Sequence, residues 1–153
     1  MTKKTLSELF ADAPGPVVQY EGLTVHGAVF RYVNKAGRFV VRFFHAVHNP
    51  IQALAINIRP GQLFIAGEES PKMLLRLDTS PNVVEVRYLP SSNGSKISLY
   101  NAWINEEGGT DAWLTHAGML VEEIGNKITL RCSDGQGEPT FDDLIVEIEF
   151  MDD

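Results

Sequence analysis

Apolar and polar residues alternate with a period of two in short segments from Val17 onward. The alternation is cleanest in Lys96–Tyr100 and Lys127–Arg131, and it is typical of antiparallel strands that bury one face. Asn–Gly, Gly–Asn and Asp–Gly pairs, which tolerate the backbone of tight turns, lie between the segments. Because no helical pattern separates these segments, they predict an all-β fold, an antiparallel β-sandwich of the jelly-roll or Greek-key type.

The predicted strands are rich in Val, Ile, Phe, Tyr and Thr, and turn residues bound them. Within Lys96–Tyr100 the alternation places Ile97 and Leu99 in the core and the other side chains outward or sideways. The predicted strands are Val17–Tyr20, Leu23–Val33, Arg38–Val47, Gln52–Ile58, Gln62–Ala66, Lys72–Leu77, Val83–Leu89, Lys96–Tyr100, Ala112–Glu122, Lys127–Cys132 and Asp143–Met151.

A short helix is predicted before the strands. Thr5 and Glu8 form a capping box, in which each side chain accepts a hydrogen bond from the backbone amide of the other residue. Apolar residues at helical spacing follow, and a Pro-Gly-Pro segment then ends the helix. We expect a helix near Thr5–Ala11 that covers one end of the core. The chain is expected to form one domain, 1–153, with 1–16 as helix and lead-in.

The composition limits the classes of partner. A chain of 153 residues is long enough for one domain with its own core, and its single cysteine excludes an internal disulfide. A formal net charge of −7 argues against nucleic-acid binding, which depends on cationic side chains. No apolar run is long enough to span a bilayer, and a secretory signal is lacking. We therefore expect a soluble acidic protein, cytoplasmic or exported without a cleavable signal peptide, and the sequence leaves a homo-oligomer open.

The sequence lacks the common hydrolase and nucleotide-binding motifs. His45 and His48 are three residues apart in a strand-like segment, where their side chains point to opposite faces and do not share a metal ion. Cys132 follows Arg131, but most such cysteines are small buried apolar residues. We therefore expect no enzymatic activity, and an enzyme whose histidines converge in space is the remaining alternative.

Two tryptophans bracket a polar loop in the second half of the chain. Trp103 and Trp113, with Tyr100, flank a segment that contains Asn105 and Asp111. Flat apolar rings beside planar polar side chains are what sugar recognition uses, because the ring contacts C–H faces and the polar groups bind hydroxyls. These residues are therefore candidates for ligand binding. The alternative is that both tryptophans fill the core beneath a polar hairpin.

An acidic turn precedes the last predicted strand. Asp134, Glu138, Asp142 and Asp143 fall within residues 133–143, together with glycines and a threonine. Crowded carboxylates repel one another unless solvent or a cation compensates them, and calcium takes six to eight hard oxygen ligands from such flexible loops. The spacing does not match an EF-hand. The four carboxylates are candidate calcium ligands, and a solvated acidic turn is the alternative.

The segment Ile128–Phe150 resembles the C-terminal part of the calcium-dependent fucose/mannose-binding bacterial lectins, which are small β-sandwiches. Residues 133–135 (Ser-Asp-Gly) resemble the turn of these lectins. Residues 138–143 resemble their calcium loop, and Leu144–Phe150 resembles their closing strand. The resemblance implies a β-sandwich that binds sugar through calcium.

The same resemblance assigns roles to single residues. Glu138, Asp142 and Asp143 match calcium ligands of the family, and Phe141 matches its aromatic spacer. Thr140 stands where the family has a carboxylate that bridges two calcium ions. The resemblance therefore implies one calcium ion in this chain rather than two.

The residues and the resemblance together predict a non-enzymatic, calcium-assisted carbohydrate-binding β-sandwich. In this hypothesis calcium accepts two sugar hydroxyls, and a tryptophan stacks on the ring. The alternative, from another class of protein, is an interaction or assembly subunit with no metal or sugar site. Calcium-dependent thermal stabilisation separates the two.

Overall fold

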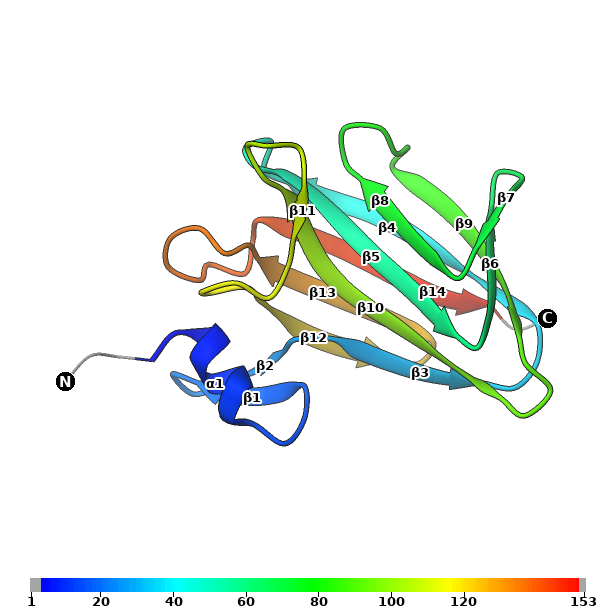
Figure 1. The fold of residues 1–153 in the computed structure, drawn as a ribbon, viewed down its shortest axis with the longest axis horizontal. Helices are drawn as coiled ribbons and strands as arrows, with labels where there is room; N and C mark the ends of the chain where they lie inside the picture. The colour runs from blue at the N-terminus through cyan, green and yellow to red at the C-terminus, as the bar shows by residue number, and fades with distance from the viewer. Residues whose placement is uncertain (1–3, 152–153) are drawn as a thin grey trace.

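The structure of the chain, a computed structural model, describes residues 4–151. Two antiparallel sheets pack face to face, and one short helix lies at one end (Figure 1). Strands make up 59% of the structure and helix 5%, which confirms the predicted all-β sandwich. No helix among the described residues is long and apolar enough to cross a membrane.

The two sheets differ in size. In spatial order, the larger sheet contains β1 (Val17–Tyr20), β2 (Leu23–His26), β12 (Gly118–Ile124), β13 (Lys127–Ser133), β14 (Leu144–Met151), β4 (Gly37–Ala46), β9 (Val83–Pro90), β6 (Gly61–Ile65) and β7 (Glu68–Ser70). The smaller sheet contains β11 (Thr110–Asp111), β10 (Ser95–Ile104), β5 (Ile51–Arg59) and β8 (Lys72–Arg76), and β3 (Val29–Val33) pairs with β10.

The core lies between the two sheets and follows the alternation in the sequence. On β10, Ile97 and Leu99 are fully buried, while Lys96, Ser98 and Tyr100 are partly exposed. The predicted register of this segment is therefore confirmed. Because β10 lies between β3 and β5, its inward side chains join one apolar cluster with those of both neighbours. Removing this apolar surface from water is the main term that stabilises the fold.

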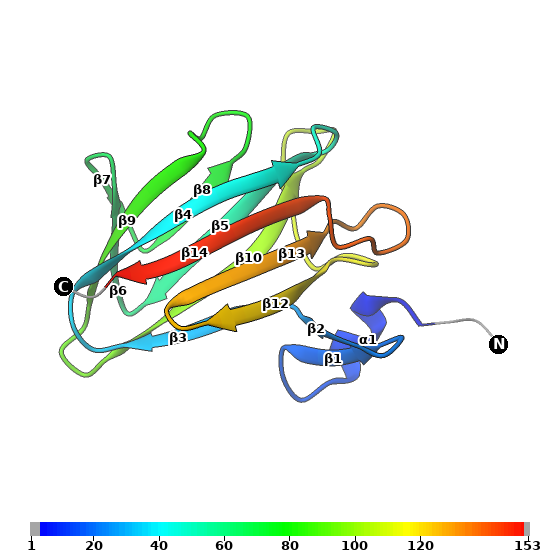
Figure 2. The same ribbon diagram turned by 180° about the vertical axis from the view of Figure 1, so that it is seen from behind.

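An N-terminal unit, which we define as α1 (Leu6–Asp12) with β1 and β2, lies at one end of the sandwich (Figure 2). The predicted capping box is present: the amide of Glu8 donates to Thr5 Oγ1 at 3.2 Å, and the amide of Thr5 donates to Glu8 Oε1 at 3.0 Å. Leu6 packs with Val25 and Phe141 in a second, smaller apolar cluster. The helix therefore covers the end of the sandwich through a cluster of its own.

Two predicted strands are broken in the structure. The segment Leu23–Val33 forms β2 and β3, which belong to different sheets. The segment Ala112–Glu122 becomes a strand only from Gly118, because the residues before it form turns in which Trp113 has a φ of 59°. A left-handed backbone at a residue with a side chain is incompatible with a strand, and an apolar pattern does not reveal it.

Ion pairs join neighbouring strands on the outer face of the larger sheet. Arg42 on β4 donates to Glu147 at 3.1 Å and to Glu149 at 2.7 Å, both on β14. Arg38 on β4 lies 3.2 Å from Glu85 on β9. These ion pairs link β4 to its neighbours β14 and β9.

Candidate binding site

The predicted calcium loop, residues 134–143, joins β13 to β14 at one end of the sandwich. Asp134 is only 3% exposed, and both of its carboxylate oxygens already accept hydrogen bonds. Gln52 Nε2 donates to Oδ2, and the amide of Gln136 donates to Oδ1, each at 2.9 Å. The amide of Asp134 in turn donates to Asp143 Oδ2 at 2.9 Å. Asp134 and Asp143 thus hold the loop in shape.

The other two predicted ligands, Glu138 and Asp142, are exposed. Within residues 4–151 no group of three or more His, Cys, Asp or Glu side chains is arranged to hold a metal ion. Calcium needs at least six oxygen ligands. The four carboxylates therefore do not form a preformed calcium site in this conformation, and the calcium site stays a prediction from the sequence.

Burial raises the pKa of the Asp143 carboxyl group. The hydrogen bond from the Asp134 amide acts against this rise, whereas the nearby charges of Asp134 and Asp142 add to it. A carboxyl group whose pKa is higher in the folded than in the unfolded chain favours folding when it is protonated. Its contribution is therefore lost as the pH rises through the folded-state pKa.

We expect Asp143→Asn to unfold less readily than the wild type at pH 7, because the amide is neutral and its oxygen still accepts the hydrogen bond. The difference in the free energy of unfolding, measured by urea titration in EDTA, should shrink as the pH falls toward about 3. Asp142→Asn, at the exposed neighbouring position, is the control and should change stability little. A less stable Asp143→Asn protein at pH 7 would show instead that the loop needs the charge.

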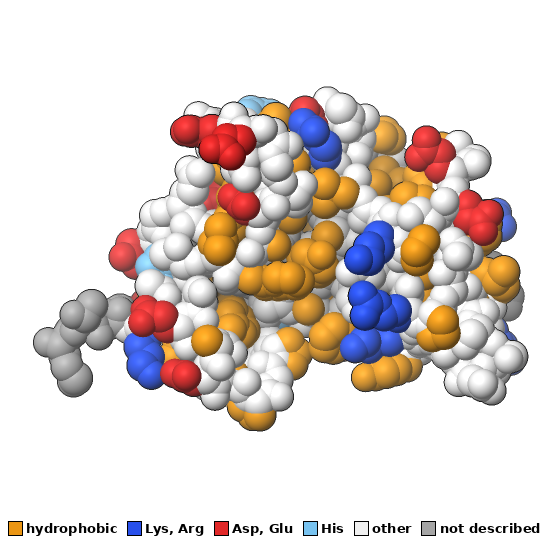
Figure 3. Space-filling view, in the orientation of Figure 1, with side chains coloured by type: hydrophobic (Ala, Val, Ile, Leu, Met, Phe, Trp, Pro, Cys, Tyr) orange, Lys and Arg blue, Asp and Glu red, His pale blue; other side chains and the backbone are white. Residues whose placement is uncertain are grey.

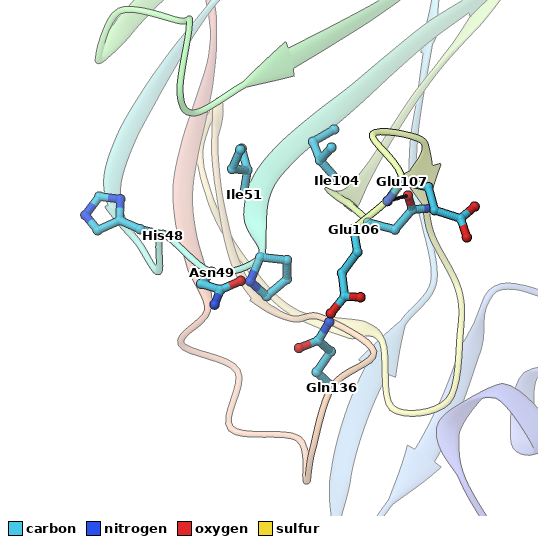
Figure 4. A pocket seen from close by; sticks show the side chains of 9 residues that line it. His48, Asn49, Ile51, Ile104, Glu106, Glu107 and Gln136 are labelled. Carbon is cyan, nitrogen blue, oxygen red and sulfur yellow. Dashed lines mark hydrogen bonds between the residues drawn. The ribbon is translucent and has the colours of Figure 1, made fainter.

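A polar hollow of about 620 Å³ opens at the same end of the sandwich, between the β4–β5 and β10–β11 loops (Figure 4). Asn49, Glu106 and Gln136 line it, and the last two side chains point toward one another. Asn105, a predicted ligand residue, also lines it, but its Oδ1 accepts hydrogen bonds from two amides of its own loop at 3.0 and 2.9 Å. No Trp, Tyr or Phe is among the described residues of this wall, so a sugar ring has no platform here.

Trp103 fills the core instead of facing solvent. It is 3% exposed, and its ring covers Gly135, where an added Cβ would lie 2.7 Å from Trp103 Cζ2. Glycine is therefore required at this position by the close approach of the ring. Asp111 pairs with Trp103 across the β10–β11 ladder and is half-buried. The predicted stacking role is thus corrected for Trp103, to which the core-filling alternative applies.

Trp113 is the predicted ligand residue that presents an exposed ring. Its side chain is 48% exposed, and Nε1 donates to the carbonyl oxygen of Gly27 at 2.8 Å. The ring centroid lies 4.3 Å from that of Tyr100, at an interplanar angle of 31°. Its left-handed backbone costs energy in a residue other than glycine, and such strain concentrates at functional sites. The hydrogen bond to Gly27 and the contact with Tyr100 hold the indole ring in one orientation.

Strand pairing places further side chains beside this ring, on the outer face of the smaller sheet. Ser98 of β10 lies between Asn57 of β5 and Phe30 of β3. Together with Tyr100 and Trp113, these residues line a hollow of about 250 Å³, which we call the aromatic hollow. Figure 3 shows apolar side chains gathered across the middle of this face, with Lys and Arg side chains in a column beside them.

Sequence reasoning found Trp113 and Tyr100 but not Phe30, Asn57 or Ser98. These three come from strands that are distant in the sequence, and only the sheet register brings them together. The sequence contains one indication of Phe30. Val29 faces the core and the next residue, Phe30, faces outward, so the segment is apolar on both faces.

Cys132 is fully buried, and burial raises the pKa of its thiol. A thiol that stays protonated is a poor nucleophile. His45 and His48 lie at exposed positions at the end of β4 and in the turn after it. Cys132 therefore fits the buried apolar alternative.

No family model matches the chain, and neither does any curated protein or solved structure. The function is therefore inferred from the surfaces of the molecule.

Proposed function

We propose that the protein is a non-enzymatic carbohydrate-binding β-sandwich that binds its sugar on the outer face of the smaller sheet. The observation that carries this proposal is the exposed ring of Trp113, which a hydrogen bond and the Tyr100 ring hold beside the aromatic hollow. A flat apolar ring packs against the C–H face of a sugar, and planar polar side chains bind hydroxyl groups. Asn57 and Ser98 supply such polar groups in the wall of the hollow.

The distribution of aromatic side chains supports the same face. Phe30 and Tyr32 of β3 are 38% and 77% exposed, and both project from the outer face that holds Trp113. Contiguous exposed apolar surface of this kind marks interaction sites on single-domain proteins. The outer face of the larger sheet carries ion pairs between strands, and its exposed apolar side chains, Val83, Leu89 and Ile124 among them, are mostly aliphatic, although Phe44 is also exposed. The feature that distinguishes the face of the smaller sheet is thus its group of aromatic rings around the hollow.

We expect Trp113→Ala to weaken glycan binding by about tenfold to a hundredfold, because the variant loses the burial of one aromatic ring. The wild type is first screened on a glycan array, and the affinity for the glycans that bind is then measured by calorimetry. Trp113→Phe, which keeps a ring, should lose less. Ile124→Ala removes an exposed apolar side chain of β12 and is the control. Unchanged binding by Trp113→Ala would place the sugar elsewhere.

Calcium binding by the loop 134–143 is a separate proposal, supported by the sequence resemblance. Calcium at a hundredfold excess over its Kd should stabilise the fold by about 2.7 kcal/mol. Magnesium should do less, since it demands compact octahedral geometry. The double variant Asp142→Asn/Asp143→Asn removes two charges and should abolish the response. Thermal melts in calcium and in EDTA measure both effects. A wild-type Tm that millimolar calcium leaves unchanged would remove calcium from the proposal without affecting the aromatic hollow.

An interaction or assembly subunit is the alternative function, and the extent of the exposed surface supports it. Leu74 of β8 is exposed on the same face as Tyr32, so apolar surface continues beyond the aromatic hollow. A protein partner would cover that whole face, whereas a sugar needs only the hollow. A wild type that binds no glycan on the array would favour this alternative.

A further inference from the structure

We infer that the sugar bound at the aromatic hollow is acidic, a polysaccharide whose units carry carboxylate or sulfate groups. This inference rests on the proposed carbohydrate-binding function and names its substrate class. The cations Lys72, Arg59 and Lys96 carry it, and we call them the cation column.

The strand register brings the cation column together at one side of the hollow. Arg59 on β5 is directly paired with Lys96 on β10, and Lys72 on β8 is paired with Asn57, two residues before Arg59. Neighbouring strands are about 4.8 Å apart, so the three side chains lie within two strand spacings. A column of Lys and Arg side chains is visible beside the apolar patch in Figure 3.

The cation column adjoins the aromatic wall. Arg59 and Lys96 both line the aromatic hollow, together with Trp113. Lys96 Nζ lies 4.3 Å from the centroid of the Phe30 ring, close enough for a cation–π contact. A ligand that stacks on the indole ring therefore meets positive charge within the same hollow.

No carboxylate in the described part of the chain forms an ion pair with any member of the cation column. Arg42 and Arg38 on the opposite face, in contrast, each have carboxylate partners. Like charges directly opposite on neighbouring strands repel, so the Arg59–Lys96 pair costs stability. The chain has a net charge of −7, yet the cation column has no carboxylate partner among the residues that the structure describes. An anionic ligand would supply that partner.

The combination of groups points to a sugar acid in particular. A uronic acid or sulfated sugar has an apolar C–H face and an anionic group on one small ring. The C–H face fits the ring of Trp113, and a guanidinium such as that of Arg59 binds a carboxylate or sulfate through two parallel hydrogen bonds. An acidic polypeptide supplies the charge without the sugar face.

The test compares acidic and neutral polysaccharides. The full chain is assayed by affinity electrophoresis and calorimetry against polygalacturonate, alginate, hyaluronan and heparin. Methyl-esterified polygalacturonate, mannan and xylan are the neutral set, and poly-glutamate represents an acidic polypeptide. The double variant Arg59→Gln/Lys96→Met removes two charges and keeps apolar contact with Phe30. Arg131→Gln, an exposed position on β13 of the larger sheet, is the matched control.

We expect the wild type to bind at least one acidic polysaccharide. The wild type should bind the neutral polysaccharides at least about tenfold more weakly, since a charge-assisted hydrogen bond contributes about that factor. The double variant should lose a similar factor in its affinity for the acidic polysaccharide. Raising the salt concentration should also weaken binding, because the cation column is near solvent. Arg131→Gln should bind as the wild type does, and thermal melts show whether each variant is folded.

The outcomes separate the inference from the proposed function. If neutral polysaccharides bind as well as acidic ones, and Trp113→Ala abolishes this binding, the inference is overturned and the carbohydrate function is kept. Acidic binding that the double variant does not weaken also overturns it. A third outcome is that poly-glutamate binds as tightly as every polysaccharide and that Trp113→Ala does not change this binding. This outcome overturns both the inference and the carbohydrate function, in favour of an acidic protein partner. Failure to bind any polysaccharide in either set overturns the inference, and failure on the glycan array as well removes the carbohydrate function itself.

Discussion

Replacing Leu99 by alanine will lower the free energy of unfolding by about 2–5 kcal/mol, because the change removes buried methyl groups and leaves a cavity. Leu99 is fully buried on β10 and is paired with Val29 of β3 and Ile56 of β5. It therefore lies in the middle of the smaller sheet, where neighbouring strands on both sides limit the collapse of a cavity.

Urea titration measures this loss. Ser98→Ala is the matched control, since it alters the adjacent residue of the same strand on the outer face and should change stability by no more than about 0.5 kcal/mol. If Leu99→Ala cost less than the control, the assignment of faces on β10 would be wrong by one residue.

Replacing Asp134 by alanine will cost about 3 kcal/mol or more. The carboxylate accepts hydrogen bonds from Gln52 Nε2 and from the amide of Gln136, and hydrogen bonds to charged groups contribute about 1.5–3 kcal/mol each. Without the carboxylate, the Gln52 side chain, which is fully buried, keeps a single partner for Nε2, the Pro50 carbonyl oxygen. Asp134→Asn keeps one acceptor oxygen, so its loss should be intermediate.

The measurement also distinguishes a structural carboxylate from a calcium ligand. Chemical denaturation in EDTA should show the full loss for Asp134→Ala, since the hydrogen bonds do not depend on a metal. Asp142→Ala, at an exposed position of the same loop, should have little effect in EDTA. An Asp134→Ala protein that is as stable as the wild type in EDTA, and weaker only in calcium, would show that the carboxylate acts through the metal.

Local sequence patterns predict more of the fold than of the candidate site. The alternation in Lys96–Tyr100 predicts its buried face correctly, since burial of a strand depends only on every second side chain. The Thr5 cap is equally local and is present in the structure. The pattern does not reveal the break between β2 and β3, because apolar residues continue across it while the chain passes from one sheet to the other.

The site depends on distances that a single sequence does not contain. Both tryptophans have similar local surroundings in the sequence, yet Trp103 is buried over Gly135 while Trp113 is exposed beside Tyr100. Trp103 lies on β10 with its side chain in the core, whereas Trp113 lies in the turns before β12. In the sequence, Asp134 is acidic and next to glycine, which favours a role as a ligand. In the structure, Gln52, 82 residues away, gives it a structural role.

The way the N-terminal unit is attached links local opening to ligand binding. Its strand pairing with the larger sheet is confined to one register pair, Met119 with His26, and the amide of Ser7 donates to the carbonyl oxygen of Thr115 at 2.8 Å, in the turn that carries Trp113. Because the unit also has an apolar cluster of its own, separate from the main core, it can open and exchange its amide protons without the rest of the fold. A ligand that needs the Trp113 ring in place binds only the closed form. Bound ligand will therefore slow hydrogen exchange in α1, although no atom of that helix lines the aromatic hollow.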